Sequence, residues 1–335
     1  MTSRVVVIGD VMLDVVVRPL TGLAPTSDTA SHIRVGRGGS AASVALAVAR
    51  SGHDVRFLGA AGNDGSAQLV RAALGRDSVR VELELVDAPT GTVVAVVGDN
   101  AQRAMLTDRG ANSLLSESFV MSQLTDSFEH LHVSGYLLLD PSTRAVAVSA
   151  LALARSRGAT TSIDVCSVEP LRVLTPPVFL EAARGATYLF ANEEEALTLS
   201  GQDEAASALE FLSARFDEVV VTRGAAGAMA ARGETRAEAA GLEVVALDTT
   251  GAGDAATGAY LAARLRGDSM EVALGAAMVA GASVALAVAR SRHDVRFLGA
   301  AGNDGSAQLV RAALEQDGVR VELELVDAPT GTVVA

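Results

Sequence analysis

The 335 residues of this sequence include no lysine and no tryptophan, and all 27 basic residues are arginines. The absence of lysine excludes the lysine of a P-loop, the strand lysine of a protein kinase and a Schiff base on lysine. Any handling of phosphate must therefore depend on backbone amides, a metal ion and arginine. Because aromatic residues make up only 3%, the core must consist mostly of Ala, Val and Leu.

Cysteine and positive charge are also scarce. The single cysteine, Cys166, excludes an internal disulfide and favours a reducing, cytoplasmic location. The formal net charge is −13, which argues against nucleic acid and against an anionic membrane surface as partners.

We expect neither a signal peptide nor a membrane span. Thr2-Ser3-Arg4 leads directly into a strand-like run. Residues 272–289 are eighteen uncharged residues, which reach the lower length limit for a membrane helix. Since this stretch is mostly Ala, Gly and Val, its composition favours a buried core helix.

Strands and helices alternate along most of the chain. The apolar run that starts at Arg4 and ends at Gly9-Asp10 is typical of a buried parallel strand. Alternation of this kind predicts a parallel sheet with helices on both faces. The later strands are expected at 54–59, 131–133, 161–164, 188–190 and 218–222, and the helices at 38–51, 66–74, 143–156, 178–184, 193–199 and 205–215.

Two further strand-like runs, Val79–Asp87 and Gly91–Gly98, flank the turn Ala88-Pro89-Thr90. Charged residues at alternate positions of the first run give it a polar side. This pattern predicts an exposed sheet and not a core strand.

The most informative stretch is Asp248-Thr-Thr-Gly-Ala-Gly-Asp254, which follows the strand-like run Leu242–Leu247 and enters a helix. A strand, a glycine turn and a helix start bring free backbone N–H groups and the positive end of a helix dipole to one place, which suits a phosphate. A carboxylate beside phosphate is unfavourable unless it is a base that takes a proton from an attacking hydroxyl. The alternative is a glycine-rich loop with an aspartate cap.

Four other motifs could carry chemistry. Asp14 lies near the end of the first strand, where ligands bind in parallel sheets, although a lone aspartate also forms turns. Gly38-Gly39 opens a helix that contains Ser43. Asn192-Glu193-Glu194-Glu195 places carboxylates at a strand end, where they could hold Mg²⁺ or simply start a helix. Thr222-Arg-Gly-Ala-Ala-Gly227 is a second glycine turn after a strand.

Together with Gly110-Ala111-Asn112, these motifs resemble the ribokinase-like, or PfkB, carbohydrate kinases in order and spacing, across about residues 4 to 281. The resemblance implies an α/β fold, with a doubly wound, mostly parallel sheet flanked by helices and a small β lid over the sugar. It implies a kinase domain at residues 1–281, with lid strands roughly within 14–37 and 79–106.

The resemblance also implies the roles of individual residues. Asp254 would be the general base, and the backbone at Gly251, Ala252 and Gly253 an anion hole. The substrate would contact Asp14, Gly38, Gly39, Ser43 and Asn112. ATP would lie at Asn192, Thr222, Gly224 and Gly227, with Mg²⁺ held by Glu195 and Asn192, directly or through water. Ser43 departs from the family, which usually has an asparagine there that contacts sugar.

A second departure is an internal repeat. Residues 42–95 recur as residues 282–335, and the 54 positions differ only at Gly52/Arg292, Gly75/Glu315, Arg76/Gln316 and Ser78/Gly318. The copy replaces the C-terminus that, in the family, helps to close the nucleotide site and supplies a monovalent-cation loop, so activation by K⁺ is in doubt. We expect the first copy to be integrated, because Gly52 suits a left-handed helix end and Arg292 does not. Residues 294–335 would then pack peripherally, pair at an edge or stay mobile.

The sequence therefore predicts an ATP-dependent kinase that phosphorylates a hydroxyl of a small sugar or related compound. Two alternatives stay open: a nucleoside kinase of the same family, and a non-catalytic protein that binds nucleotide and sugar because its altered C-terminus has disabled it. The acceptor is not identified by the sequence, and a homodimer is compatible with it.

Overall fold

The computed structural model describes residues 4–24, 26–98, 103–242, 251–287, 296–302 and 320–326. The predicted strand at 242–247 lies almost wholly outside this range. Asp248, Thr249 and Thr250 of the glycine-rich motif, and most of residues 282–335, also lie outside it.

The main sheet has nine strands in the order β13-β12-β11-β10-β9-β8-β1-β4-β5. The strands from β11 to β5 in this order run parallel, while β12 and β13 form an antiparallel extension at one edge. Their bounds are β1 Arg4–Ile8, β4 Asp54–Gly62, β5 Arg80–Val86, β8 His130–Ser134, β9 Thr160–Asp164, β10 Tyr188–Asn192, β11 Glu218–Thr222, β12 Ala228–Arg232 and β13 Thr235–Ala239.

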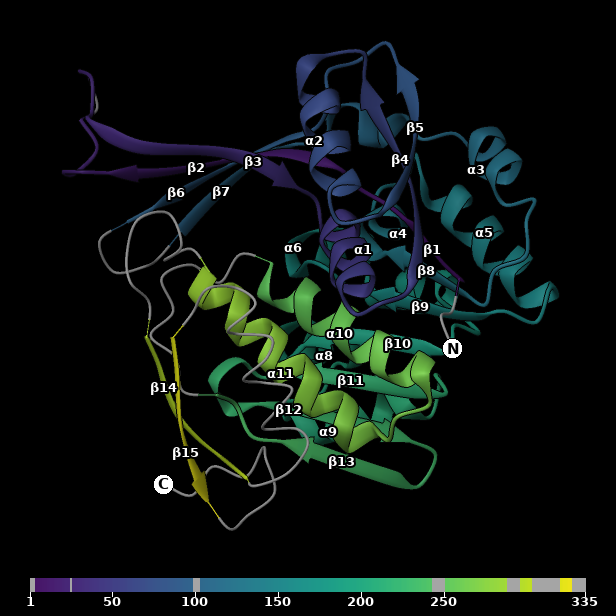
Figure 1. Cartoon of the computed structure of the whole chain (residues 1–335). Helices are drawn as coiled ribbons and strands as arrows, with labels where there is room; N and C mark the ends of the chain where they lie inside the picture. Colours follow the sequence, from purple (N-terminus) through teal and green to yellow (C-terminus); the bar gives the residue numbers. More distant parts are fainter. Residues whose placement is uncertain are drawn as a thin grey trace.

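Helices cover both faces of this sheet (Figure 1). Alternate residues of β1 point to opposite faces: Val5 and Val7 contribute to one apolar cluster, Val6 and Ile8 to another. The first cluster includes α1 Ser40–Arg50, α2 Gly65–Gly75, α10 Ala252–Arg266 and α11 Met270–Ala287. The second includes α3 Glu117–Gln123, α4 Gly135–Leu139, α5 Arg144–Ser156, α6 Val168–Leu174, α7 Pro176–Ala182, α8 Glu193–Ser200 and α9 Ala205–Ser213. The chain also forms two short 3-10 turns, η1 Gly110–Leu114 and η2 Gly224–Ala226.

A four-stranded lid sheet extends away from the main sheet (Figure 1). Its order is β3-β2-β6-β7, with bounds β2 Met12–Pro19, β3 Ser31–Gly38, β6 Thr92–Val97 and β7 Arg103–Asp108. The predicted lid segment at 14–37 therefore corresponds to β2 and β3.

The lid prediction is wrong for residues 79–87. The strand β5 pairs in parallel with β4 at the edge of the main sheet, and its residues Arg56↔Arg80 to Gly62↔Val86 are in register. An edge strand has one partner and a partly solvated face, so it carries the same alternation of polar side chains as a lid strand. Only the second run, β6, belongs to the lid.

The second copy of the repeat forms the same strand pair in a separate place. β14 Arg296–Gly302 and β15 Arg320–Val326 are parallel, and their register is that of β4 and β5 shifted by the repeat. They form a two-stranded sheet of their own, whereas the first copy lies in the nine-stranded sheet. Gly52, just after the end of α1, has φ = 90°, so the first copy carries glycine at the left-handed position where the second carries Arg292.

The uncharged stretch near residue 280 forms α11, which packs against α10. Ala273, Leu274 and Ala277 are buried in this contact layer. Of the helices in the described ranges, none has the length and apolar character needed to cross a membrane.

Candidate active site

Five parallel strands end at one edge of the main sheet, and each brings a polar residue there. Asp10 follows β1, and the others are the last residues of their strands: Ser134 of β8, Asp164 of β9, Asn192 of β10 and Thr222 of β11. With the lid they enclose a cleft of about 2330 Å³, which Asp10, Asp164, Asn192 and Thr222 line. The carboxyl edge of a parallel sheet is where such folds bind their ligands.

Asp10 organises the entrance to α1. Its Oδ2 accepts a hydrogen bond from the backbone N–H of Ser40 at 2.8 Å, and its Oδ1 accepts one from the hydroxyl of Ser134 at 2.8 Å. The N-cap residue Gly39 has no side chain, so Asp10 supplies the missing acceptor for the helix start. Gly39 also has φ = 100°, and a Cβ there would lie 2.5 Å from the carbonyl oxygen of Asp10. Only glycine fits this turn.

Asp254 lies in the first turn of α10, a helix that begins directly after the left-handed residue Gly251. Its Oδ1 accepts a hydrogen bond from the hydroxyl of Ser40 at 2.6 Å. Asp254, Gly251 and Gly253 all line the cleft. A Cβ at Gly253 would meet no atom of the described residues within 4 Å, so they leave space in front of this backbone.

Burial is the main cause that raises the pKa of Asp254 to about 8. The charge of Asp164 adds to the increase, while the hydrogen bond from Ser40 and the charge of Arg37 oppose it. Glu195 follows the same pattern, because burial and then Asp164 raise its pKa to about 8. Carboxylates crowded in a cleft with raised pKa values are a mark of a functional site.

Asn192 and Glu195 form a capping box at the start of α8. Asn192 Oδ1 accepts from the Glu195 N–H at 2.9 Å, and Glu195 Oε2 accepts from the Asn192 N–H at 2.9 Å. Both residues also line the cleft. The two interpretations of this acidic run are thus compatible, since Glu195 starts a helix and still faces the cleft.

Four of the residues predicted to contact the substrate line the cleft: Asp14, Gly38, Gly39 and Ser43. A Cβ at Gly38 would lie 3.0 Å from the Cβ of Asp14, so glycine lets the two strands β2 and β3 meet here. The Ser43 hydroxyl accepts a hydrogen bond from Arg37 at 3.0 Å.

Several predicted site residues do not line the cleft: Ala252, Asn112, Gly224 and Gly227. Asn112 is 2% exposed, and its amide exchanges hydrogen bonds with the backbone of Val11 at 2.9 and 3.0 Å. Gly227 has φ = 93°, and a Cβ there would lie 2.0 Å from the carbonyl oxygen of Ala239. These contacts give Asn112 and Gly227 structural roles that support the residues beside them.

Sequence reasoning missed Asp10 and Asp164. Asp164 is a buried acid that accepts hydrogen bonds from Thr257 of α10 at 2.9 Å and from the Cys166 N–H at 3.1 Å. Burial is the main cause that raises its pKa to about 6. Asp10 follows the apolar strand β1 and Asp164 ends the buried strand β9, so the rule that parallel strands end at one edge was the available signal.

The donor set is suited to a hydrated magnesium ion. Within the described part of the chain, no three His, Cys, Asp or Glu side chains are arranged to hold a metal directly. Glu195 and Asp164 do offer carboxylate oxygens to the cleft, and oxygen ligands acting partly through water are what Mg²⁺ prefers.

Comparison with known proteins gives a consistent picture. Residues 2–286 match the pfkB family carbohydrate kinases. The chain is 32% identical over 292 residues to the ATP-dependent ribose-1-phosphate kinase of Halopiger xanaduensis, an alignment that covers 84% of this chain and 92% of that protein. It is 30% identical over 273 residues to a fructokinase of Klebsiella pneumoniae, with coverage of 78% and 84%.

Solved structures share the architecture. The adenosine kinase of Sinorhizobium meliloti superposes with a TM-score of 0.78 at 21% identity, covering 93% of this chain and 100% of that one. A putative Ribokinase II from E. coli, in complex with ATP and Mg²⁺, gives a TM-score of 0.75 at 23% identity, with coverage of 87% and 94%. At these identities the likeness concerns the fold alone, and it confirms the predicted ribokinase-like architecture.

Proposed function

The chain belongs to the pfkB family of carbohydrate kinases, phosphotransferases that act on a sugar hydroxyl, and we propose that it transfers the γ-phosphoryl group of ATP with Asp254 as general base. The observation that carries this proposal is the position of Asp254. Asp254 lies in the first turn of α10 and lines the cleft. Its pKa is also raised, to about 8.

Asp254 is suited to receive a proton. A base works best when its pKa is near the working pH, and a pKa of about 8 meets that condition. In the proposed step the acceptor hydroxyl gives its proton to Asp254 while its oxygen forms a bond to the γ-phosphorus. The bond from that phosphorus to the bridging oxygen of ADP breaks, and ADP leaves with the electron pair.

The start of α10 is suited to stabilise the transferring group. The first N–H groups of a helix have no partner within the helix, and the dipole makes this end positive. The backbone at Gly251, Ala252 and Gly253 would form the anion hole. The open space at Gly253 supports this role, because a side chain there would fill the room that a phosphoryl group needs.

The nucleotide side of the cleft is assigned to Asn192, Thr222 and the turn that Gly224 and Gly227 shape. Glu195, together with Asp164 and Asn192, would hold Mg²⁺ through water. The ion would supply charge neutralisation for the phosphates.

The acceptor would lie against Asp14, Gly38, Gly39 and Ser43 under the lid. Because Arg37 already donates to Ser43, this serine presents less free hydrogen-bonding capacity than the asparagine usual in the family. The names of the relatives, a ribose-1-phosphate kinase and a fructokinase, support a sugar or sugar phosphate as acceptor. A cytoplasmic location is supported by the free thiol of Cys166.

The test is a measurement of ADP release with MgATP over a panel of sugars, sugar phosphates, sugar acids and nucleosides, with and without K⁺. Acceptor-dependent ADP release with at least one compound is the expected result. Binding of ATP by calorimetry without any acceptor-dependent turnover would instead favour a protein disabled by its altered C-terminus.

A further inference from the structure

Arg109 lies where the lid meets the main domain. It directly follows β7 of the lid and directly precedes η1. Its Nε donates to Asp140 Oδ2 at 3.1 Å, and its guanidinium carbon lies 5.4 Å from the ring centre of Tyr136. Tyr136 lies in α4 of the main domain, and Asp140 directly follows this helix. Arg109, Tyr136 and Asp140 all line the cleft.

The backbone around Arg109 is held in place from several sides. Asn112 Nδ2 donates to the Arg109 carbonyl at 3.0 Å, and the Gly110 N–H donates to Asp108 at 3.0 Å. A Cβ at Gly91 would lie 2.7 Å from the Arg109 carbonyl oxygen, so the backbone directly before β6 packs tightly against it. The guanidinium is thus carried on a rigid support, which lowers the entropy cost of binding through it.

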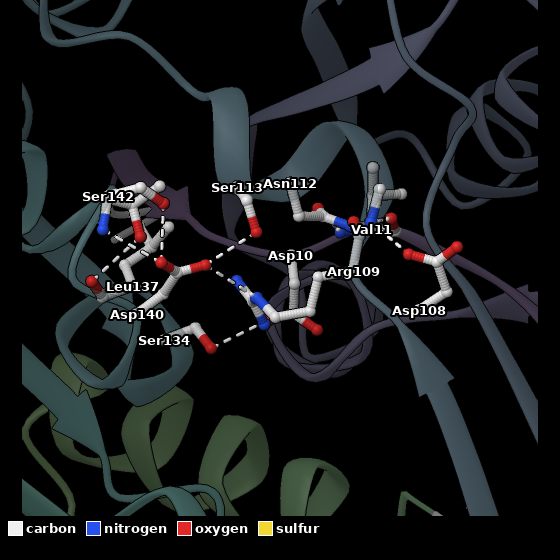
Figure 2. Close-up of polar contacts among 12 residues, drawn as sticks. Asp10, Val11, Asp108, Arg109, Asn112, Ser113, Ser134, Leu137, Asp140 and Ser142 are labelled. Carbon is white, nitrogen blue, oxygen red and sulfur yellow. Dashed lines mark hydrogen bonds and ion pairs between the residues drawn. The ribbon is translucent and has the colours of Figure 1, made fainter. Parts of the chain in front are cut away.

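The carboxylate of Asp140 has hydrogen-bond donors other than the guanidinium of Arg109. It also accepts hydrogen bonds from the Ser113 hydroxyl at 2.7 Å, from the Ser142 N–H at 2.9 Å and from the Ser142 hydroxyl at 2.6 Å (Figure 2). Burial raises the pKa of Asp140, but these hydrogen bonds and the charge of Arg109 outweigh it, so its pKa is lowered overall. Both carboxylate oxygens are therefore already satisfied.

In contrast, the guanidinium of Arg109 has N–H donors that remain unpaired. Among the described residues, its buried Nη2 has no hydrogen-bond partner. A buried donor left unpaired is unfavourable, and more so when it is charged, so native proteins rarely retain one without a reason. Of the other arginines that line the cleft, Arg37 already donates to Ser43.

We propose that Arg109 selects the acceptor by binding an anionic substituent, a phosphate monoester or a carboxylate, on the end of the molecule remote from the reacting hydroxyl. The inference rests on the proposed function of the cleft. A planar guanidinium pairs with these two anions through parallel N–H donors, and a neutral hydroxyl gains much less from it. Because Arg109 lies between β7 of the lid and η1, the anion would bind at the junction of the lid and the main domain.

The experiment compares matched acceptors in ADP release and in calorimetric binding: ribose with ribose 1-phosphate, fructose with fructose 1-phosphate, and 2-keto-3-deoxygluconate as the carboxylate probe. The wild-type protein should show a higher kcat/KM for an anionic acceptor than for its neutral partner. Arg109→Met should lower kcat/KM for the anionic acceptor about 10- to 100-fold, which is what one or two charged hydrogen bonds contribute. The loss should be in KM, while the neutral acceptor is little affected.

Two further variants separate recognition from folding. Arg109→Lys keeps the charge without the fork, so it should restore phosphate binding better than carboxylate binding. Arg144→Met is the matched control, because Arg144 donates to the Leu138 carbonyl beside the same loop but does not line the cleft. It should leave the preference for anionic acceptors unchanged.

The outcomes distinguish this inference from the proposed function. If no compound supports ADP release but ribose 1-phosphate binds the wild type and not Arg109→Met, transfer fails and the assignment of Arg109 stands. If the wild type turns over neutral acceptors as well as anionic ones, or if Arg109→Met lowers both equally while remaining folded, the assignment is wrong. If Arg109→Met does not fold, the wild-type preference and the response of Arg109→Lys decide.

Discussion

Ser40 and Asp254, 214 residues apart in the chain, share a hydrogen bond of 2.6 Å between Ser40 Oγ and Asp254 Oδ1. The bond joins the first turns of α1 and α10, which approach closely because Gly258 of α10 has no side chain. A Cβ there would lie 2.5 Å from the Cβ of Ala47. In the free protein the Ser40 hydroxyl therefore donates to the proposed base, as an acceptor hydroxyl would.

The first prediction follows from that bond and concerns pH. Asp254 must be deprotonated to act, so kcat/KM should rise with pH through about 8. The Ser40 hydrogen bond lowers the pKa of Asp254, so Ser40→Ala should move this rise to higher pH. Asp164→Asn removes a negative charge that raises the same pKa, so it should move the rise to lower pH.

A pH series of kcat/KM for the three proteins is the measurement. Shifts of the two variants in the same direction would show that the rise with pH belongs to another group.

Much of this site was predictable because its residues are local in sequence. Asp254, Gly251 and Gly253 share one turn, and Gly38 and Gly39 share another, so a short motif specifies each group. Asp10 could not be assigned in the same way, because its partners Ser40 and Ser134 are distant in sequence and meet it only in the folded sheet. The contact of Arg109 with Asp140 likewise joins residues 31 positions apart, so no short motif marks it.

The second prediction concerns metal. Glu195→Gln keeps an oxygen that can accept from the Asn192 N–H, so α8 should still start normally. It removes a carboxylate from the metal side of the cleft, so the Mg²⁺ concentration for half-maximal activity should rise while KM for the acceptor stays unchanged.

Glu193→Gln is the matched control, because Glu193 is exposed in the same helical turn and does not line the cleft. Identical Mg²⁺ titrations for both variants would leave Glu195 with its capping role only.

The third prediction concerns stability. Glu218 is 1% exposed and accepts hydrogen bonds from Arg264 at 2.8 Å and from the Tyr260 hydroxyl at 2.7 Å, which ties α10 to β11. Glu218→Ala leaves the Arg264 charge uncompensated and should lower the free energy of unfolding by about 3–5 kcal/mol. Removing the exposed partner Glu181 of Arg184 should cost less than about 1 kcal/mol. Urea denaturation of the two alanine variants compares the pairs, and equal losses would contradict the prediction.

The fourth prediction concerns two buried histidines of β8. His130 and His132 are fully buried, and both contact the hydroxyl of Ser162 on β9. Burial lowers the pKa of His132 to about 3, below the value of about 6.5 in the unfolded chain. Above pH 6.5 His132 is neutral in both states, so it does not lower the free energy of unfolding. As the pH falls from 6.5 toward 3, only the unfolded chain takes up the proton, and the free energy of unfolding falls by about 1.4 kcal/mol per pH unit.

His132→Leu should remove this part of the pH dependence. The difference in unfolding free energy between wild type and variant, measured by urea at pH 7.5 and pH 5.0, isolates it from the carboxylates. A difference that does not change with pH would show that folding leaves the pKa of His132 at its unfolded value.

The edge strand β5 shows a physical limit of pattern analysis. Alternating charges reveal that one face of a strand is solvated, but they do not identify the sheet to which it belongs. The pairing of β5 with β4 depends on a parallel connection through α2, whose geometry lies beyond the local pattern.

The most direct test of the central assignment is Asp254→Asn, assayed with MgATP and the best acceptor of the panel. Asparagine keeps the shape of the side chain but cannot take the proton. ADP release should fall by about 10²- to 10⁴-fold, the usual contribution of a general base, while ATP binding by calorimetry stays unchanged and the variant remains folded. Near-normal turnover in this variant would contradict the account and leave Asp254 as a residue of the helix start only.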